Sequence, residues 1–262
     1  IERVLPSLGE AGVEQAVLAD LVPMHRFGLK EDPRIAKVKG SLRMTDFLTK
    51  AVRDRERPLR EDFVLPFGAG YLRLKVGESA RIVREARRRF RRHNAAHRWV
   101  ETEVVAALAA TGREQNPDLE TLRDSLRDVA EYRALLVRMW PILTPAELLH
   151  DLFGSKALLR SAGESLADDE WPLLYRDRQV SLDDVQWSDS DIALLDEAMS
   201  LLGPRPRKSG RIHEADEVRT YGHIVIDEVQ DLTPMQLRMV SRRSLNGAMT
   251  VVGCLLYTSP SP

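Results

Sequence analysis

The sequence has little cysteine, few lysines and no long apolar run. Cys254 is the single cysteine in 262 residues, which excludes an internal disulfide and is typical of a protein from a reducing compartment. No apolar stretch reaches the roughly 20 residues that a membrane-spanning helix needs, and no signal peptide is recognisable. We therefore expect a cytoplasmic protein without a membrane partner.

An excess of one charge is also missing. The 39 basic and 40 acidic residues leave a net charge of −1, which argues against a uniformly basic nucleic-acid-binding protein. The charges are nevertheless segregated, because residues 81–98 carry eight arginines and one acid, whereas residues 164–197 carry eleven acids and two arginines. Solvated helix faces are the commoner explanation for such runs, and a nucleic-acid or protein contact of the arginine run is the alternative.

Most of the chain has helical periodicity. Apolar residues recur at helical spacing over 35–57, 79–111, 119–139 and 189–202, and Thr144 begins a further short helix with Pro and Glu at the positions that a capping box requires. Asn94 is a candidate interruption of the helix 79–111. The two long helices 79–111 and 119–139 predict an antiparallel hairpin. Phe63–Phe67 is predicted to be extended, and Gly203–Gly210 reads as a linker.

The pattern changes after that linker. The apolar run Ile224–Ile226 predicts a buried parallel strand, and the sequence Thr233-Pro234-Met235-Gln236 predicts a capped helix to about Ser244. A second apolar strand follows over Met249–Val252. These three elements form a β-α-β unit, so the fold class is α/β with a large, mostly α-helical insertion.

Three acids and a glutamine follow the first strand, at the edge where open α/β sheets place their ligands. They are Asp227, Glu228, Gln230 and Asp231. An Asp at a strand end can hold Mg²⁺ on a nucleotide, since phosphates and water supply most of the ligands of that ion. The adjacent Glu can orient the attacking water. The string is a Walker B pattern, which is typical of ATP-driven motors.

The phosphate-binding loop that accompanies this pattern is absent. Its signature ends in Gly-Lys-Ser/Thr, and the only lysine followed by either hydroxyl residue is Lys208, which follows Arg and Pro. The chain also begins without Met, inside an apparent helix. We interpret it as a fragment of a larger P-loop NTPase.

The segment Tyr221–Gly253 resembles motif II, and the approach to motif III, of superfamily 1 helicases of the UvrD type. Other segments are similar to the HelD-like branch of that superfamily, in its actinobacterial form: Ile1–Glu10, Leu42–Met44, Arg91–Ala96 and Trp140–Leu149. The resemblance covers about residues 1–253.

This resemblance implies a RecA-like ATPase that uses ATP and Mg²⁺ to release RNA polymerase from DNA or another nucleic-acid complex. By position, Asp227 would ligate Mg²⁺, Glu228 would be the catalytic carboxylate, and Gln230 and Asp231 would complete the nucleotide-binding motif. The expected domains are a first ATPase segment (1–33), a helical insertion that binds the polymerase (34–203), the ATPase segment with motif II (204–253) and a non-native tail (254–262).

The chain departs from the family pattern after Gly253, where an Asp-x-x-Gln sequence would carry the γ-phosphate sensor. It continues instead as Cys254-Leu255-Leu256-Tyr257. We therefore expect no functional role for Cys254 and no ATP hydrolysis by the fragment alone.

Two other functions remain open at the level of sequence. A UvrD-type DNA repair helicase would separate a forked duplex without polymerase. A non-enzymatic polymerase-binding module would tolerate loss of the Glu228 carboxylate.

Overall fold

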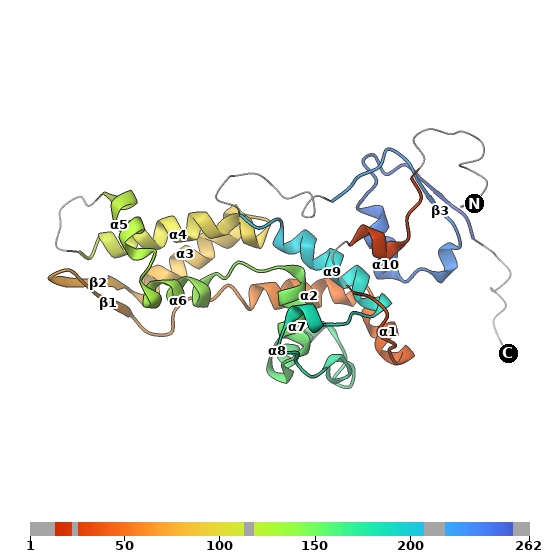
Figure 1. Cartoon of the computed structure of the whole chain (residues 1–262), viewed down its shortest axis with the longest axis horizontal. Coiled ribbons are helices and arrows are strands. Elements are labelled where there is room, and N and C mark those ends of the chain that lie inside the picture. The colour runs from red at the N-terminus through yellow and green to blue at the C-terminus, as the bar shows by residue number, and fades with distance from the viewer. Residues whose placement is uncertain (1–13, 23–25, 113–117, 207–217, 254–262) are drawn as a thin grey trace. The chain divides into compact units, whose positions relative to one another are not determined.

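The computed structural model describes residues 14–22, 26–112, 118–206 and 218–253 (Figure 1). The expected helix at 1–9, the second half of the Gly203–Gly210 linker and the expected non-native tail therefore lie outside the described residues. The chain divides into two compact units. Unit 1 comprises residues 1–41, 185–194 and 218–262, and unit 2 comprises residues 42–184 and 195–217. The inserted unit thus begins at Leu42. The chain passes from unit 1 to unit 2 a second time between Leu194 and Leu195, within a helix.

Unit 2 is mostly helical, with one antiparallel β-hairpin. Its elements are α2 (Arg43–Arg53), β1 (Phe63–Phe67), β2 (Gly70–Leu74), α3 (Val76–Arg89), α4 (His93–Ala109), α5 (Leu119–Leu126), α6 (Ala130–Met139), α7 (Pro145–Phe153), α8 (Lys156–Ala162), the 3₁₀ turns η3 (Gly163–Ser165), η4 (Trp171–Leu174) and η5 (Leu182–Asp184), and the end of α9 (Asp189–Leu202).

Three stretches with helical periodicity in the sequence are each divided into two helices. The predicted helix 35–57 is α1 (Pro33–Lys39) followed by α2, and the predicted helices 79–111 and 119–139 are the pairs α3–α4 and α5–α6. The interruption of 79–111 expected at Asn94 is confirmed, because α3 ends at Arg89 and α4 begins at His93. The prediction of one continuous helix over 119–139 was wrong. The hydrophobic period continues across each break, so periodicity alone does not locate it.

The β-hairpin contains the predicted extended piece and a second strand that sequence reasoning missed. Leu65 pairs with Leu72, and both are buried, whereas Val64 and Tyr71 point outward and are exposed. Gly68 has φ +57° in the turn, a conformation that favours glycine.

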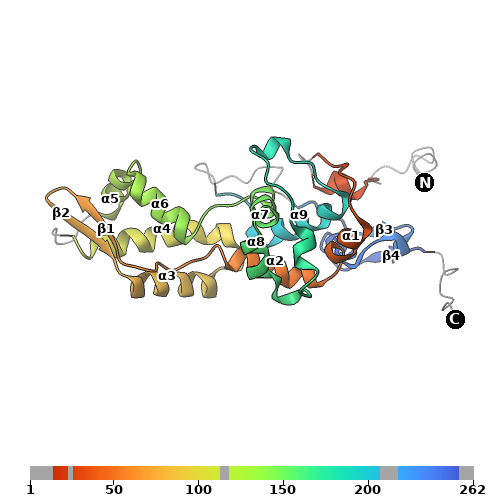
Figure 2. The same cartoon turned by 90° about the horizontal axis from the view of Figure 1, so that it is seen from below.

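A single hydrophobic core joins the hairpin to the four helices α3–α6, which lie together in both views (Figures 1 and 2). Its fully buried members include Leu74 from the hairpin, Ile82 from α3, Leu108 from α4 and Leu126 from α5. A smaller cluster of Val52, Leu143, Leu148, Ala198 and Leu202 packs α2, α7 and the end of α9 together.

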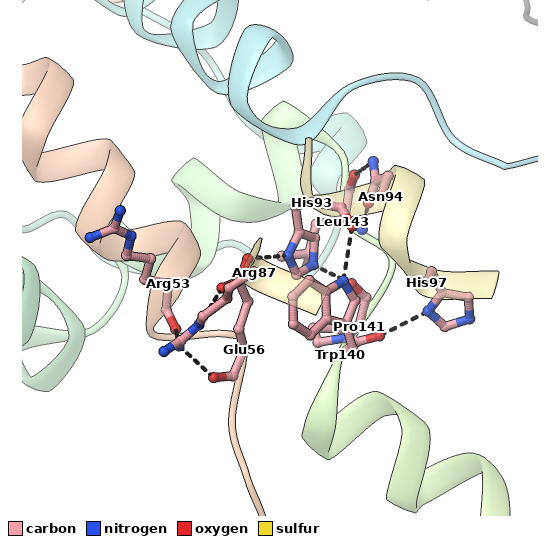
Figure 3. A network of polar contacts seen from close by, with 9 residues as sticks. All are labelled: Arg53, Glu56, Arg87, His93, Asn94, His97, Trp140, Pro141 and Leu143. Carbon is pink, nitrogen blue, oxygen red and sulfur yellow. Dashed lines mark hydrogen bonds and ion pairs between the residues drawn. The ribbon is translucent and has the colours of Figure 1, made fainter. Parts of the chain in front are cut away.

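A buried polar network explains the break between α3 and α4 (Figure 3). Asn94 is 1% exposed, and its amide donates to the carbonyls of Leu143 (2.9 Å) and Gly203 (3.0 Å). Its carbonyl accepts the Leu143 N–H at 3.1 Å. Phe90 takes an extended conformation before α4 begins at His93. The new helix thus starts where these buried polar side chains reach backbone groups of other segments.

His93 and Trp140 extend this network. Their rings stack at 5.0 Å between centroids, and the Trp140 indole N–H donates to the His93 carbonyl at 2.9 Å. The two ring nitrogens of His93 lie 3.1 Å from Glu56 Oε1 and 2.7 Å from the Pro141 carbonyl oxygen. Arg87 holds the other oxygen of Glu56 at 2.8 Å. The buried Glu56 is therefore held by two partners from different segments.

His97 marks the edge of the same network. It is hydrogen-bonded through Nδ1 to the Trp140 carbonyl oxygen at 2.9 Å. Burial lowers the pKa of His97, and this backbone hydrogen bond partly opposes that shift. The imidazole is therefore favoured in its neutral form, donating from Nδ1.

Unit 1 contains a small parallel sheet. Its elements are η2 (Leu18–Leu21), α1, the start of α9, β3 (Ile224–Ile226), η7 (Val229–Asp231), α10 (Pro234–Ser241) and β4 (Met249–Val251). β3 pairs with β4 in parallel, with Ile224 opposite Met249 and Ile226 opposite Val251. The predicted β-α-β unit is confirmed, and the fold is mixed α/β with helix predominating. No helix among the described residues is long and apolar enough to cross a membrane.

Replacing Asn94 by alanine tests the network in unit 2. Asn94→Ala leaves three buried backbone groups without their partner, so we expect a loss of about 2–4 kcal/mol in the free energy of unfolding. Urea denaturation followed by circular dichroism measures it. Asn246→Ala, at an exposed position, should change stability by less than about 0.5 kcal/mol. Equal effects of the two substitutions would contradict the role assigned to Asn94.

Candidate functional site

The acidic string lies where β3 ends, as the sequence predicts. Asp227 and Glu228 follow the last strand residue directly, and Gln230 and Asp231 lie in or at the end of the single turn η7. The side chains of all four are exposed. The Val252 N–H donates to the Ile226 carbonyl at 2.8 Å, and the Val229 N–H donates to the Val252 carbonyl at 3.0 Å. Val252, the residue after β4, therefore holds the backbone on both sides of the Asp227–Glu228 pair.

Glu228 has a left-handed backbone conformation, with φ +50° and ψ +47°. Among the described residues, it is the only one other than glycine with a positive φ. Such a conformation costs a residue with a Cβ about 1–2 kcal/mol and is found preferentially at functional sites. Here it turns the chain sharply from β3 into η7.

The side chains around Glu228 restrain the acidic loop, residues 227–231. The Glu228 N–H donates to Asp227 Oδ1 at 3.0 Å, and the Gln230 side-chain amide donates to Glu228 Oε2. The backbone turns are closed by the Asp231 N–H, which donates to the Glu228 carbonyl at 2.9 Å. The loop is thus a defined turn that presents carboxylates outward.

The prediction that β3 is a buried strand was wrong for the described residues. Ile226 is 6% exposed, but Val225 is 63% exposed, as are Val251 (50%) and Val252 (49%). Within the described residues the sheet has only two strands, and these three valines remain largely exposed to solvent. The sequence pattern shows that the strand is apolar, but its burial depends on how many neighbouring strands join the sheet, which the pattern does not show.

Gly253 is a residue of the site that pattern reasoning did not single out. A Cβ added there would lie 2.7 Å from Gln230 Oε1 and 2.9 Å from Val229 Cγ1. The end of β4 therefore passes close against η7, and only a residue without a side chain fits without a shift. Glycine at this position was visible in the sequence, but the contact that requires it was not.

The chemistry of the acidic loop is compatible with one-carboxylate coordination of Mg²⁺. Asp227 is exposed, and its Oδ1 accepts the hydrogen bond from Glu228, which orients the carboxylate. No cluster of three or more His, Cys, Asp or Glu side chains that could hold a metal occurs among the described residues. One oriented carboxylate is enough for an ion such as Mg²⁺ when phosphate and water supply its other ligands.

The arginine run 81–98 is partly neutralised within unit 2. Arg81 pairs with Glu78 and Glu103, and Arg87 pairs with Glu56. Arg88 and Arg89 both pair with Glu85. Four exposed arginines form no ion pair within the described residues: Arg84, Arg91, Arg92 and Arg98. Half of the arginines in the run are therefore paired within unit 2, and half are exposed without an ion pair among the described residues.

No protein-family model matches the chain, and no curated protein matches it either.

Two substitutions at Glu228 separate backbone strain from the role of the carboxylate. Both Glu228→Gly and Glu228→Ala remove the side chain, but only glycine relieves the left-handed conformation. We expect the glycine variant to be more stable than the alanine variant by about 1 kcal/mol in urea denaturation. At Arg238, inside α10, the order should reverse by about 1 kcal/mol, since glycine weakens helices. An alanine variant of Glu228 as stable as the glycine variant would show that φ is not constrained there.

Proposed function

We propose that the chain is part of an ATP-driven, superfamily 1 helicase-like motor that remodels or releases RNA polymerase on nucleic acid. The observation that carries the proposal is the acidic string on the carboxyl end of β3, followed by a helix with a capping box and a second parallel strand. In a P-loop NTPase of the RecA-like class this edge faces the nucleotide. The left-handed backbone at Glu228 supports a functional role for the same turn.

The residues of the acidic loop have distinct roles in this proposal. Asp227 would hold Mg²⁺, which when bound neutralises charge on the phosphates of ATP. Glu228 lies one residue further along and would orient the attacking water, with Gln230 donating a hydrogen bond that fixes its carboxylate. The phosphate-binding loop, the γ-phosphate sensor and the arginine finger would come from other parts of the intact protein.

Unit 2 would supply the partner contact. It lies between segments of unit 1 in the sequence and has its own core, and its run 81–98 includes four exposed arginines without an ion pair within the described residues. Arginine is the side chain best suited to bind carboxylates or phosphates through two parallel hydrogen bonds. A helical arm with free arginines therefore suits an acidic surface of a polymerase complex.

Glu228→Gln tests the catalytic assignment in the full-length protein that contains this chain. The amide keeps the size of the side chain but cannot act as a base, so kcat for ATP hydrolysis should fall about a hundredfold or more, with little change in KM. Steady-state phosphate release measures both constants. Asp183→Asn, at an exposed carboxylate of η5, is the control and should leave both unchanged. An unchanged rate with Glu228→Gln would favour a non-enzymatic polymerase-binding module.

Charge reversal tests the partner surface in the 262-residue chain. We expect the triple variant Arg84→Glu, Arg91→Glu and Arg98→Glu to weaken binding to purified actinobacterial RNA polymerase about tenfold or more, because each of these arginines is exposed and has no ion-pair partner in the part of the chain that the structure describes. Surface plasmon resonance at two salt concentrations measures it.

The matched control for this experiment carries the same charge change on exposed arginines outside the run: Arg127→Glu, Arg133→Glu and Arg138→Glu. The control triple should bind as the wild-type chain does. If both triples lose affinity equally, the effect follows net charge and the arginine run is no specific contact. If the wild-type chain does not bind polymerase, a forked-duplex unwinding assay on the full-length protein decides whether a DNA repair helicase is the better description.

A further inference from the structure

The break after α1 lies against the helix that follows the acidic loop. Gly40 is buried, and its carbonyl accepts the Met235 N–H, from the first turn of α10, at 3.0 Å. A Cβ on Gly40 would lie 2.8 Å from both Cβ and Cγ2 of Thr233. The backbone of Gly40 has φ −74° and ψ −12°, which any residue adopts. Glycine is required here by the close approach alone.

Thr233 connects this contact to the acidic loop. It is the N-cap of α10, where its hydroxyl accepts the Gln236 N–H at 3.3 Å and its own N–H donates to the Gln236 side chain at 2.8 Å. Between Glu228 and Thr233, the Leu232 N–H donates to the Val229 carbonyl at 3.1 Å. The turn and the capping box therefore restrain the backbone between Glu228 and Thr233. A displacement of the Glu228 backbone is therefore passed to Thr233 and on to Gly40.

A buried ion pair fixes the residue before Gly40. The Lys39 side chain is 2% exposed, and its ammonium lies 2.8 Å from Oδ1 of Asp191, which is fully buried in the first turn of α9. The same ammonium donates to Glu31, which also accepts hydrogen bonds from Ser188 and Ser190. Removing one partner of such a buried pair is strongly destabilising, because a charge is left without compensation. Lys39 thus ties the end of α1 firmly to the start of α9.

These contacts lie at the points where the chain passes between the units. Unit 1 ends its first segment at Ser41, one residue after Gly40, and its second segment is residues 185–194, which contains Ser188 and Asp191. We propose that Gly40 and Lys39 are positioning residues that lock the acidic loop to both of these crossing segments. A nucleotide-dependent change at Glu228 would then reach the insertion through them. This inference rests on the proposed function, but its structural part can be tested without ATP or polymerase.

Hydrogen–deuterium exchange with mass spectrometry on the 262-residue chain tests the coupling. Glu228→Ala perturbs the acidic loop, and the exchange rates of peptides covering 33–41 and 186–194 are the readout. In the wild-type background we expect exchange in both peptides to accelerate about threefold or more. With Gly40→Ala already present, the added Glu228→Ala should change neither peptide further, because the contact with Thr233 is already broken. A role confined to stability would give additive effects instead.

The controls are matched in chemistry and unit. Gly222→Ala places a Cβ where no atom lies within 4 Å, and Lys37→Met removes an exposed ammonium from α1. Both backgrounds should keep the full response to Glu228→Ala. If Gly40→Ala does not fold, the pair Lys39→Met and Asp191→Asn replaces it and should abolish the response at 186–194. This pair removes the fully buried charge of each sign and leaves Glu31, which keeps its hydrogen bonds from Ser188 and Ser190.

Two results would overturn the proposal. One is the absence of any response to Glu228→Ala in the wild-type background, and the other is an undiminished response after the Gly40 contact or the Lys39 ion pair is broken. Neither result depends on nucleotide. Failure of the coupling is therefore distinguishable from failure of the proposed ATPase, which Glu228→Gln reports separately.

Discussion

One buried ammonium group holds together the parts of unit 1 that are far apart in sequence. Lys39 brings a carboxylate from the loop before α1 and a carboxylate from the start of α9 to the same buried point. Two negative charges around one positive charge would be costly, but Asp191 lies in the first turn of a helix, where the helix dipole favours an anion. The hydroxyls of Ser188 and Ser190 satisfy Glu31 in addition. Because these partners are specific in geometry, the two chain segments have one well-defined arrangement.

The acidic loop depends on this arrangement through α10. Its backbone is held by β4 on one side and by the capped start of α10 on the other, and α10 is in turn held by Gly40. A strained residue such as Glu228 persists only where its surroundings determine its conformation. These surroundings are the β3–β4 sheet, the capping box at Thr233 and the contact of Gly40 with α10. The strain is localised where the catalytic carboxylate is proposed to act.

Local signals in the sequence predicted local structure well. Thr144 and Thr233 each begin a helix with the predicted capping box, and Asp227 follows a parallel strand as expected. These features depend on residues within four positions of one another, so one sequence is enough to identify them.

The features that the sequence did not predict depend on distant partners. The break at Gly40 lies against Thr233, and no local pattern encodes that contact. Asn94 could be named as an interruption from the sequence, but its partners Leu143 and Gly203 could not. The exposure of Val225 likewise depends on how many strands join the sheet. The same limit applies to the candidate site: its residue types could be proposed from the sequence, whereas the left-handed turn and the close approach of Gly253 required the structure.

The central claim is that the acidic loop at the end of β3 lies beside the metal of a bound nucleotide. Iron-directed cleavage tests it most directly: Fe²⁺ replaces Mg²⁺ in the full-length protein with ATP present, and peroxide then cuts the backbone next to the ion. The account predicts an ATP-dependent cut within residues 226–229, which Asp227→Ala abolishes. An ATP-dependent cut elsewhere with none at these residues, or a cut that does not require ATP, would contradict it.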